Sequence, residues 1–166
     1  IEAKAIEINS LNANGLKGET FFFLTDTHYP ANNNGHAIEI INELAKRTSV
    51  RKVIWGGDIV ANLDTPTKMA DELRRVAKEF DSDLEVHPLR GNHEIDGGLT
   101  VDQFWDAQCR KISNFCTVDG KIYYCRDDNA TKIRYIMTDF VAPETELNED
   151  DRKQIEWVKE KILELE

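Results

Sequence analysis

The sequence predicts a layered α/β fold in which helices flank a sheet whose strands run largely parallel. Short apolar segments alternate with longer amphipathic ones through the first hundred residues, the usual pattern of strands joined by helical crossovers. Apolar residues make up 40% of the 166 residues and charged residues 31%. A chain of this size and balance can bury one core, so residues 1–166 are expected to form a single domain.

Three apolar segments are expected to form the sheet, because each is bounded by glycines or polar turns. They are Phe21–Thr25, Val53–Trp55 and Leu84–Leu89. Two helices are expected between them, because apolar residues recur there at helical spacing. The first covers about 36–47, with Asn34 as its N-cap, and the second follows Thr65-Pro66.

The pattern changes after residue 98. A short helix is expected around 101–110, followed by strands over 121–126 and 132–138 with a hairpin turn at 127–130. An amphipathic helix over about 148–165 closes the chain. At the other end, weak alternation over 3–8 predicts a short edge strand, and the Asn- and Gly-rich residues 9–18 predict a turn.

The net charge bears on which partners the protein can bind, and the cysteine content bears on the redox compartment in which it works. The formal net charge is −10, which disfavours a generic nucleic-acid or anionic membrane surface because the field of the protein repels both. No apolar run approaches the roughly 20 residues that a membrane-spanning helix needs. The three cysteines form no C-x-x-C pair and no zinc spacing. Reduced thiols in a cytoplasmic protein are the simplest interpretation.

Three polar clusters stand immediately after the three predicted strands. They are Asp26-Thr27-His28, Gly57-Asp58 and Gly91-Asn92-His93-Glu94. The carboxyl ends of strands in an open α/β sheet form the crevice where ligands bind, so the clusters are expected to meet. Carboxylate, imidazole and amide oxygen together suit borderline divalent ions. Each cluster alone also occurs in ordinary turns, but all three at successive strand ends indicate a metal site.

In these clusters the chain resembles the calcineurin-like metallophosphoesterase superfamily, whose pattern is D-x-H, then G-D, then G-N-H-[DE]. The resemblance runs from about residue 20 to residue 166. It implies a layered metallophosphoesterase-like sheet with flanking helices. It also implies a metal-dependent phosphoester hydrolase, either a phosphomonoesterase or a phosphodiesterase, whose substrate the sequence does not identify.

The resemblance assigns roles to the cluster residues. Asp26 and His28 would bind a first metal ion, Asp58 would bridge two ions, and Asn92 would bind the second. His93 would protonate the leaving-group oxygen as a general acid, while a metal-bound hydroxide attacks phosphorus. The implied cofactor is a pair of divalent ions, Mn²⁺ first, with Fe, Zn, Ni or Mg as alternatives.

The chain departs from the family pattern in its second half. That pattern continues with a lone His after a further strand and then G-H-x-H, whereas all four histidines here (28, 36, 87 and 93) precede residue 94. We therefore expect the C-terminal third of the domain to be missing, metal occupancy to be reduced and this chain to be weak or inactive alone. An exposed surface for self-association would follow. The alternative is a non-catalytic fragment or scaffold with an incomplete metal site.

Four nearby residues have simpler interpretations. His87 lies inside a predicted strand and is expected to be structural, and His36 is expected at the surface. Asp139 is expected to be a turn residue. The loop from Tyr29 to Asn34 follows a metal motif directly, so it is a candidate substrate contact.

Overall fold

The computed structural model describes residues 1–13, 18–30, 36–61, 63–108, 116–117, 122–139 and 147–165. Its elements, in chain order, are α1 Glu2–Ala13, β1 Phe22–Leu24, α2 His36–Arg47, β2 Lys52–Trp55, α3 Pro66–Ala77, β3 Glu85–Pro88, α4 Asn92–Asp96, α5 Val101–Gln108, β4 Cys116–Thr117, β5 Tyr124–Asp128, β6 Ile133–Met137 and α6 Glu149–Leu163. No helix among these described parts is both long and apolar enough to cross a bilayer.

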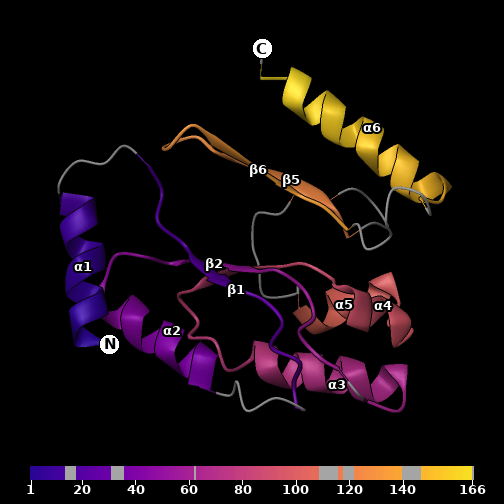
Figure 1. Ribbon diagram of the computed structural model, residues 1–166, viewed down its shortest axis with the longest axis horizontal. Coiled ribbons are helices and arrows are strands. Elements are labelled where there is room, and N and C mark those ends of the chain that lie inside the picture. The colour runs from indigo at the N-terminus through magenta and orange to yellow at the C-terminus, as the bar shows by residue number, and fades with distance from the viewer. Residues whose placement is uncertain are drawn as a thin grey trace.

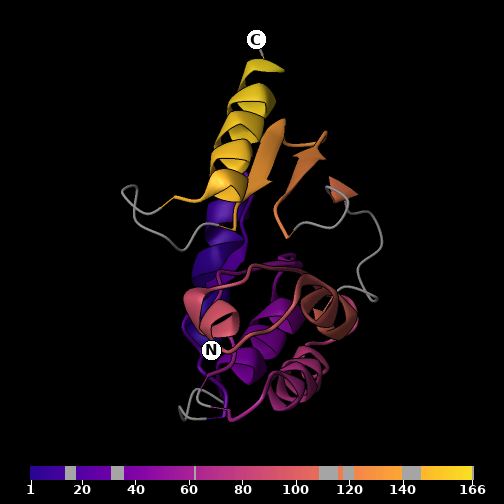
Figure 2. The ribbon, with the colours of Figure 1, turned by 90° about the vertical axis from the view of Figure 1, so that its right-hand side faces the viewer.

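The elements form successive layers (Figures 1 and 2). Helices α2, α3 and α5 cover one face of a parallel sheet ordered β1-β2-β3, and an antiparallel sheet ordered β4-β5-β6 faces its other side. Helix α6 lies on the outer face of the second sheet. The predicted α/β class, the three strands of the first sheet and their parallel pairing are confirmed.

The core lies mainly between the parallel sheet and its helices. Val53 and Trp55 of the central strand β2 pack there with Leu73 of α3, all three fully buried. Ile54, between them in sequence, points to the other face, because successive side chains of a strand alternate. There it joins a smaller cluster with Tyr124 and Met137 of the second sheet. Strand β2 is therefore covered on both faces, as its unbroken apolar sequence indicates.

The predicted edge strand over 3–8 is wrong, because these residues lie within helix α1. Alternation over six residues also fits a helix, and the Ala, Lys and Glu content of this segment favours one. Contacts with α2 then anchor the helix: Asn9 Nδ2 donates to the Arg47 carbonyl at 2.9 Å, and the Arg47 guanidinium pairs with Glu2 at 2.7 Å. The predicted turn over 9–18 is thus helical as far as residue 13.

The predicted hairpin is present, but its turn lies two residues later than expected. Strands β5 and β6 pair with Asp128 opposite Ile133, so the turn covers 129–132. The Asp128 carboxylate accepts the backbone N–H groups of Ala130 and Thr131 at 2.9 and 3.1 Å, and Lys132 takes a left-handed φ of 61°. This side-chain cap fixes the turn position.

The predicted helices are present over 36–47, after Thr65-Pro66, over 101–108 and over 149–163. Thr65 accepts the Lys68 N–H as the N-cap of α3, and Asn148 accepts the Asp151 N–H as the N-cap of α6. Asn34, the predicted cap of α2, falls outside the described residues, as do residues 109 and 110. The short helix α4 over the Gly-Asn-His-Glu motif was not predicted.

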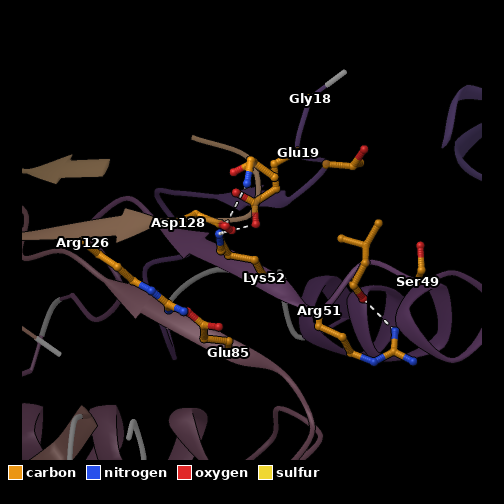
Figure 3. A pocket seen from close by; sticks show the side chains of 11 residues that line it. Gly18, Glu19, Ser49, Arg51, Lys52, Glu85, Arg126 and Asp128 are labelled. Carbon is orange, nitrogen blue, oxygen red and sulfur yellow. Dashed lines mark hydrogen bonds and ion pairs between the residues drawn. The ribbon is translucent and has the colours of Figure 1, made fainter. Parts of the chain in front are cut away.

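A polar pocket of about 390 Å³ lies at the amino ends of β2 and β3. Figure 3 shows Lys52 pointing toward Glu19 and Asp128, with Arg126 of β5 facing Glu85 of β3. The Lys52 ammonium is nearly buried and also lies 4.3 Å from the ring centroid of Tyr135. These ion pairs tie the amino end of the parallel sheet to the hairpin.

Strand β1 is an edge of the parallel sheet. The Phe23 side chain on this edge is 63% exposed, and Phe21 beside it meets the Tyr135 ring edge-on at 6.3 Å. An edge strand with exposed aromatic side chains offers both unpaired backbone groups and apolar area to another chain.

The first prediction concerns the main core. Leu73→Ala removes a side chain with no exposed surface and should lower the free energy of unfolding by about 2–5 kcal/mol, through lost transfer energy and the remaining cavity. Leu163→Ala, at a position that is 62% exposed on α6, is the control and should change it by less than about 0.5 kcal/mol. Urea unfolding followed by circular dichroism measures both. Equal effects at the two positions would contradict this placement of the core.

Candidate metal centre

The loops that follow β1 and β2 run side by side beyond the ends of their strands. The N–H groups of Asp26, His28 and Tyr29 donate to the carbonyls of Gly57, Asp58 and Ile59 at 3.2, 2.9 and 2.8 Å. Tyr29 and Val60 form a further parallel bridge. The parallel pairing of the sheet therefore continues into the loops and brings the first polar cluster against the second.

Three residues of the two clusters have left-handed backbones. Asp26, His28 and Asp58 have φ values of 53°, 47° and 50°. Residues other than glycine enter this region at an energetic cost, and such strain persists where surrounding contacts enforce it, commonly at functional sites. Here the conformation turns the side chains of His28 and Asp58 toward one another: His28 Nε2 lies 3.5 Å from Asp58 Oδ2.

The third cluster is joined to the second by the buried carboxylate of Glu94. One Glu94 oxygen accepts the N–H groups of Gly91 and Asp58 at 2.7 and 3.1 Å, and the other accepts those of Ile59 and Val60 at 2.7 and 2.9 Å. Burial raises the pKa of Glu94, and the hydrogen bonds from the backbone oppose that rise. Glu94 thus fixes the backbone on which Asp58 stands.

The Gly57 and Gly91 positions bring the second and third loops into contact. Gly57 has a φ of 95°, and a Cβ added there would lie 2.8 Å from the Gly91 nitrogen. A Cβ added at Gly91 would overlap the Asp58 carboxylate. Only glycine fits this close approach without displacing the loops.

His28, Asp58 and His93 each place a ligand atom within 4.8 Å of the others. The His28 and His93 rings are 4.6 Å apart between centroids, and the His93 backbone N–H donates to Asp58 Oδ1 at 3.1 Å. All three residues are half-buried. Two imidazoles and a carboxylate at this spacing form a donor set that can hold a divalent ion.

Asp26 lies beside this group without joining it. Its Oδ1 is 4.0 Å from His28 Nε2, while its Oδ2 accepts the Thr25 hydroxyl at 2.8 Å and its side chain is 63% exposed. Asn92 is the first residue of α4 and is exposed, one position before His93. The structure therefore brings His28, Asp58 and His93 together at the carboxyl end of the sheet, with Asp26 at the margin of the group and Asn92 next to His93 in the chain. Their individual roles stay predictions.

Arg90, directly before the third cluster, connects it to α6. Its guanidinium makes two hydrogen bonds to Asp139, at 2.6 and 3.2 Å, and a third to the Leu99 carbonyl at 3.3 Å. The Asp139 N–H donates to the buried side chain of Gln154 on α6 at 2.6 Å. Burial raises the pKa of Asp139, and the ion pair with Arg90 opposes the rise. Asp139 is therefore more than the turn residue expected from the sequence.

Other residues considered in the sequence lie away from the donor group. His36 is exposed and contacts Glu39, and His87 is buried, in contact with Glu85 and Arg126. Burial lowers the pKa of His87 to about 4, with Lys52 contributing in the same direction. Tyr29 is buried in the core, which contradicts its candidacy as a substrate contact, and residues 31–35 lie outside the described chain.

The sequence contained a signal for Glu94 that the motif interpretation left unused. Gly91 is the N-cap of α4 and Glu94 is its third helical residue, the spacing of a capping box. That spacing predicts that the Glu94 carboxylate accepts the backbone N–H of Gly91 at the start of the same helix. No sequence signal connects Arg90 with Asp139, which are 49 residues apart.

Comparisons with known proteins agree with this arrangement. Residues 19–162 match the calcineurin-like phosphoesterase family, so the chain belongs to that family. The matched segment contains both sheets and all residues of the donor group. Searches of curated proteins and of solved structures each give no significant match.

The second prediction concerns Glu94. Glu94→Gln puts an amide NH₂ opposite two backbone N–H groups, which leaves buried donors without acceptors and should lower the free energy of unfolding by about 1–3 kcal/mol. The amide hydrogens of Ile59 and Val60 should also exchange faster. Asp96→Asn, at an exposed position of the same helix, is the matched control. Unchanged exchange at residues 59 and 60 in Glu94→Gln would disprove the anchoring role.

Proposed function

We propose that this domain hydrolyses phosphoesters with the help of divalent metal ions. One observation carries the proposal: His28, Asp58 and His93 offer ligand atoms within 4.8 Å of one another in a member of the calcineurin-like phosphoesterase family. The donor group stands at the carboxyl end of a parallel sheet, the usual ligand-binding end of such folds. The reaction is the cleavage of a phosphomonoester or a phosphodiester.

The residues present fit at least one divalent ion. His28 Nε2 lies between two carboxylates, 3.5 Å from Asp58 Oδ2 and 4.0 Å from Asp26 Oδ1. In the two-ion arrangement, Asp26 and His28 would hold one ion, Asn92 would hold the other and Asp58 would serve both, with Mn²⁺ as the first candidate. Bound ions would supply an activated water and would offset negative charge on the phosphoryl oxygens.

The protein's own groups orient the reacting atoms. The His93 N–H and the Glu94 carboxylate fix Asp58 from two sides, through its side chain and its backbone. The His93 ring lies next to His28 and is only half-buried, so a leaving-group oxygen can approach it. A protonated His93 would donate its proton to that oxygen as the ester bond breaks. The non-catalytic scaffold remains the alternative function.

The third prediction separates these two functions. With Mn²⁺ added, the chain should slowly hydrolyse at least one ester in a panel of phosphomonoesters and phosphodiesters, in line with its expected weak metal occupancy, and EDTA should abolish the reaction. His93→Gln should reduce kcat by about 10²–10⁴-fold on alkyl esters, whose leaving groups need a proton. The reduction should be much smaller on nitrophenyl esters, whose leaving groups depart without one. His36→Gln, at an exposed position on α2, is the control and should retain full activity.

Two results would count against the proposal. A rate with Mn²⁺ that equals the rate in buffer, for every ester, would favour the scaffold. An equal loss on alkyl and nitrophenyl esters in His93→Gln would remove the general-acid role while leaving hydrolysis itself in place.

We also propose that the chain self-associates through the β1 edge, a proposal supported by the exposed Phe23 side chain and by the pairing of β1 with β2 alone among the described strands. Phe23→Lys should shift the chain from dimer to monomer in sedimentation velocity, because a charge on an edge strand opposes edge-to-edge pairing. Ile40→Lys, at an exposed apolar position on α2, is the control and should leave the dimer unchanged. A wild-type chain that stays monomeric at 100-fold different loading concentrations would contradict the proposal.

A further inference from the structure

We infer that Cys116 and Cys125 form a reversible disulfide that joins strands β4 and β5. Neither residue belongs to the candidate metal centre, so the inference goes beyond the proposed function and is independent of it. It rests on the register of the second sheet and on the position of Cys125 within that sheet. The link would hold β4, a strand of only two residues, on the central strand β5.

The register of the second sheet places the two cysteines directly opposite one another. Strands β4 and β5 are antiparallel, with Cys116 opposite Cys125 and Thr117 opposite Tyr124. Directly opposite residues of an antiparallel pair have Cα atoms about 4.5 or 5.5 Å apart, depending on the type of pair. A disulfide joins residues whose Cα atoms are about 4.4–6.8 Å apart. Both types of pair fall within that range, so the link requires no change of register.

Cys125 lies on the outer face of the second sheet. Its neighbour Tyr124 is fully buried on the inner face, in the cluster with Ile54 of the parallel sheet. Because successive side chains of a strand alternate, Cys125 lies on the face that α6 covers (Figures 1 and 2). Opposite positions of two paired strands share a face, so the register places Cys116 on this outer face as well.

The surroundings of Cys125 leave its thiol partly accessible but slow to react by itself. The residue is half-buried. Arg134 of β6 is held by Asp127 and by the Lys161 carbonyl of α6, at 2.6 and 2.7 Å. Burial raises the pKa of Cys125, and Arg134 opposes part of that rise. Because the thiolate is the reactive form, an added oxidant is needed to link this thiol at neutral pH.

A low-molecular-weight disulfide, such as oxidised glutathione, would serve as the oxidant. The thiolate of one cysteine attacks a sulfur of the reagent, which forms a mixed disulfide and releases one reagent thiolate. The thiolate of the other cysteine then attacks the protein sulfur of the mixed disulfide and releases the second reagent thiolate. The two protein thiols thereby lose two electrons and two protons, and the reagent takes them up as two thiols. A reducing compartment reverses both steps.

Tryptic peptide mapping tests the pairing directly. Trypsin cuts after Lys and Arg, so the three cysteines fall in three different peptides, of which 112–121 carries Cys116 and 122–126 carries Cys125. The native chain, treated with oxidised glutathione and then alkylated, should yield these two peptides linked to one another. Pairs that contain Cys109 should be at least about tenfold less abundant, because the register aligns Cys116 with Cys125.

The unfolded chain is the control for pairing that depends only on proximity in the sequence. Cys109 and Cys116 are seven positions apart, whereas Cys116 and Cys125 are nine positions apart. Loop closure in concentrated urea therefore slightly favours the first of these pairs. The preference for Cys116 with Cys125 should disappear in urea, because it depends on the fold.

A variant that moves one cysteine by a single position tests the register. Cys116→Ser combined with Thr117→Cys places the thiol opposite Tyr124 and on the other face of the sheet. Its link to Cys125 should be at least about tenfold less abundant than the wild-type link. The linked wild-type chain should also melt about 5–10 °C above the reduced chain, and Cys116→Ser alone should remove this difference.

Four results would overturn the inference. They are a native chain that forms no disulfide, a native chain that pairs Cys109 as readily as the unfolded chain does, an equal yield of the link from position 117, and a linked chain that melts no higher than the reduced one. The wild-type peptide map decides the matter even if a variant fails to fold. None of these measurements depends on metal binding or on phosphoester hydrolysis.

Discussion

The candidate site depends on one buried carboxylate, that of Glu94. Its two oxygens accept four backbone N–H groups from two loops that are more than thirty residues apart in the chain. Burying a carboxylate is expensive unless its oxygens are hydrogen-bonded, and here both are. Because three of the four donors follow one another at Asp58, Ile59 and Val60, the carboxylate holds the whole loop after β2 against the start of α4. Together with the hydrogen bond from the His93 N–H to Asp58 Oδ1, it fixes how these two residues lie relative to one another.

Two ion-pair groups extend this arrangement to the second sheet from opposite ends of the first. At the amino end, Lys52 meets Glu19 and Asp128. At the carboxyl end, Arg90 pairs with Asp139, whose backbone is held by Gln154 of α6. Buried pairs of this kind add little net stability, but removing one partner is costly. Their effect is to specify how the second sheet and α6 lie over the parallel sheet.

The negative net charge of the protein is compatible with an anionic substrate only if a bound ion reverses the field at the site. A net charge of −10 repels an anionic phosphoester at long range. Asp26 and Asp58 add to that repulsion at the site itself. A bound divalent ion would reverse the local field, so metal binding would prepare the site for substrate as well as for chemistry. His28, which lies between the two carboxylates, would supply a nitrogen ligand without adding further negative charge.

The sequence by itself determined most of the helices and strands and the end of the sheet at which the candidate ligands gather. Apolar segments predicted β1, β2 and β3, helical spacing predicted α2, α3 and α6, and the polar residues after each strand predicted a donor group, of which the structure brings His28, Asp58 and His93 together. These inferences succeed because strand ends and amphipathic faces depend on neighbouring residues. The segment over 3–8 shows the limit of local patterns, since six alternating residues fit a strand as well as a helix. Helix-favouring residues and contacts with α2 both support the helix observed there.

Tertiary structure decided the rest, because those interactions join residues that no local pattern relates. The pairing of Arg90 with Asp139 spans 49 positions, and the burial of Tyr29 depends on helices that pack over it. The same holds for the ligand geometry. The left-handed backbones of Asp26, His28 and Asp58 occur where backbone hydrogen bonds join the loops after β1 and β2. Glu94 holds the second of these loops through its hydrogen bonds. The motifs indicated which side chains would meet, and only the packing of the loops placed His93 against His28 and turned Asp26 toward solvent.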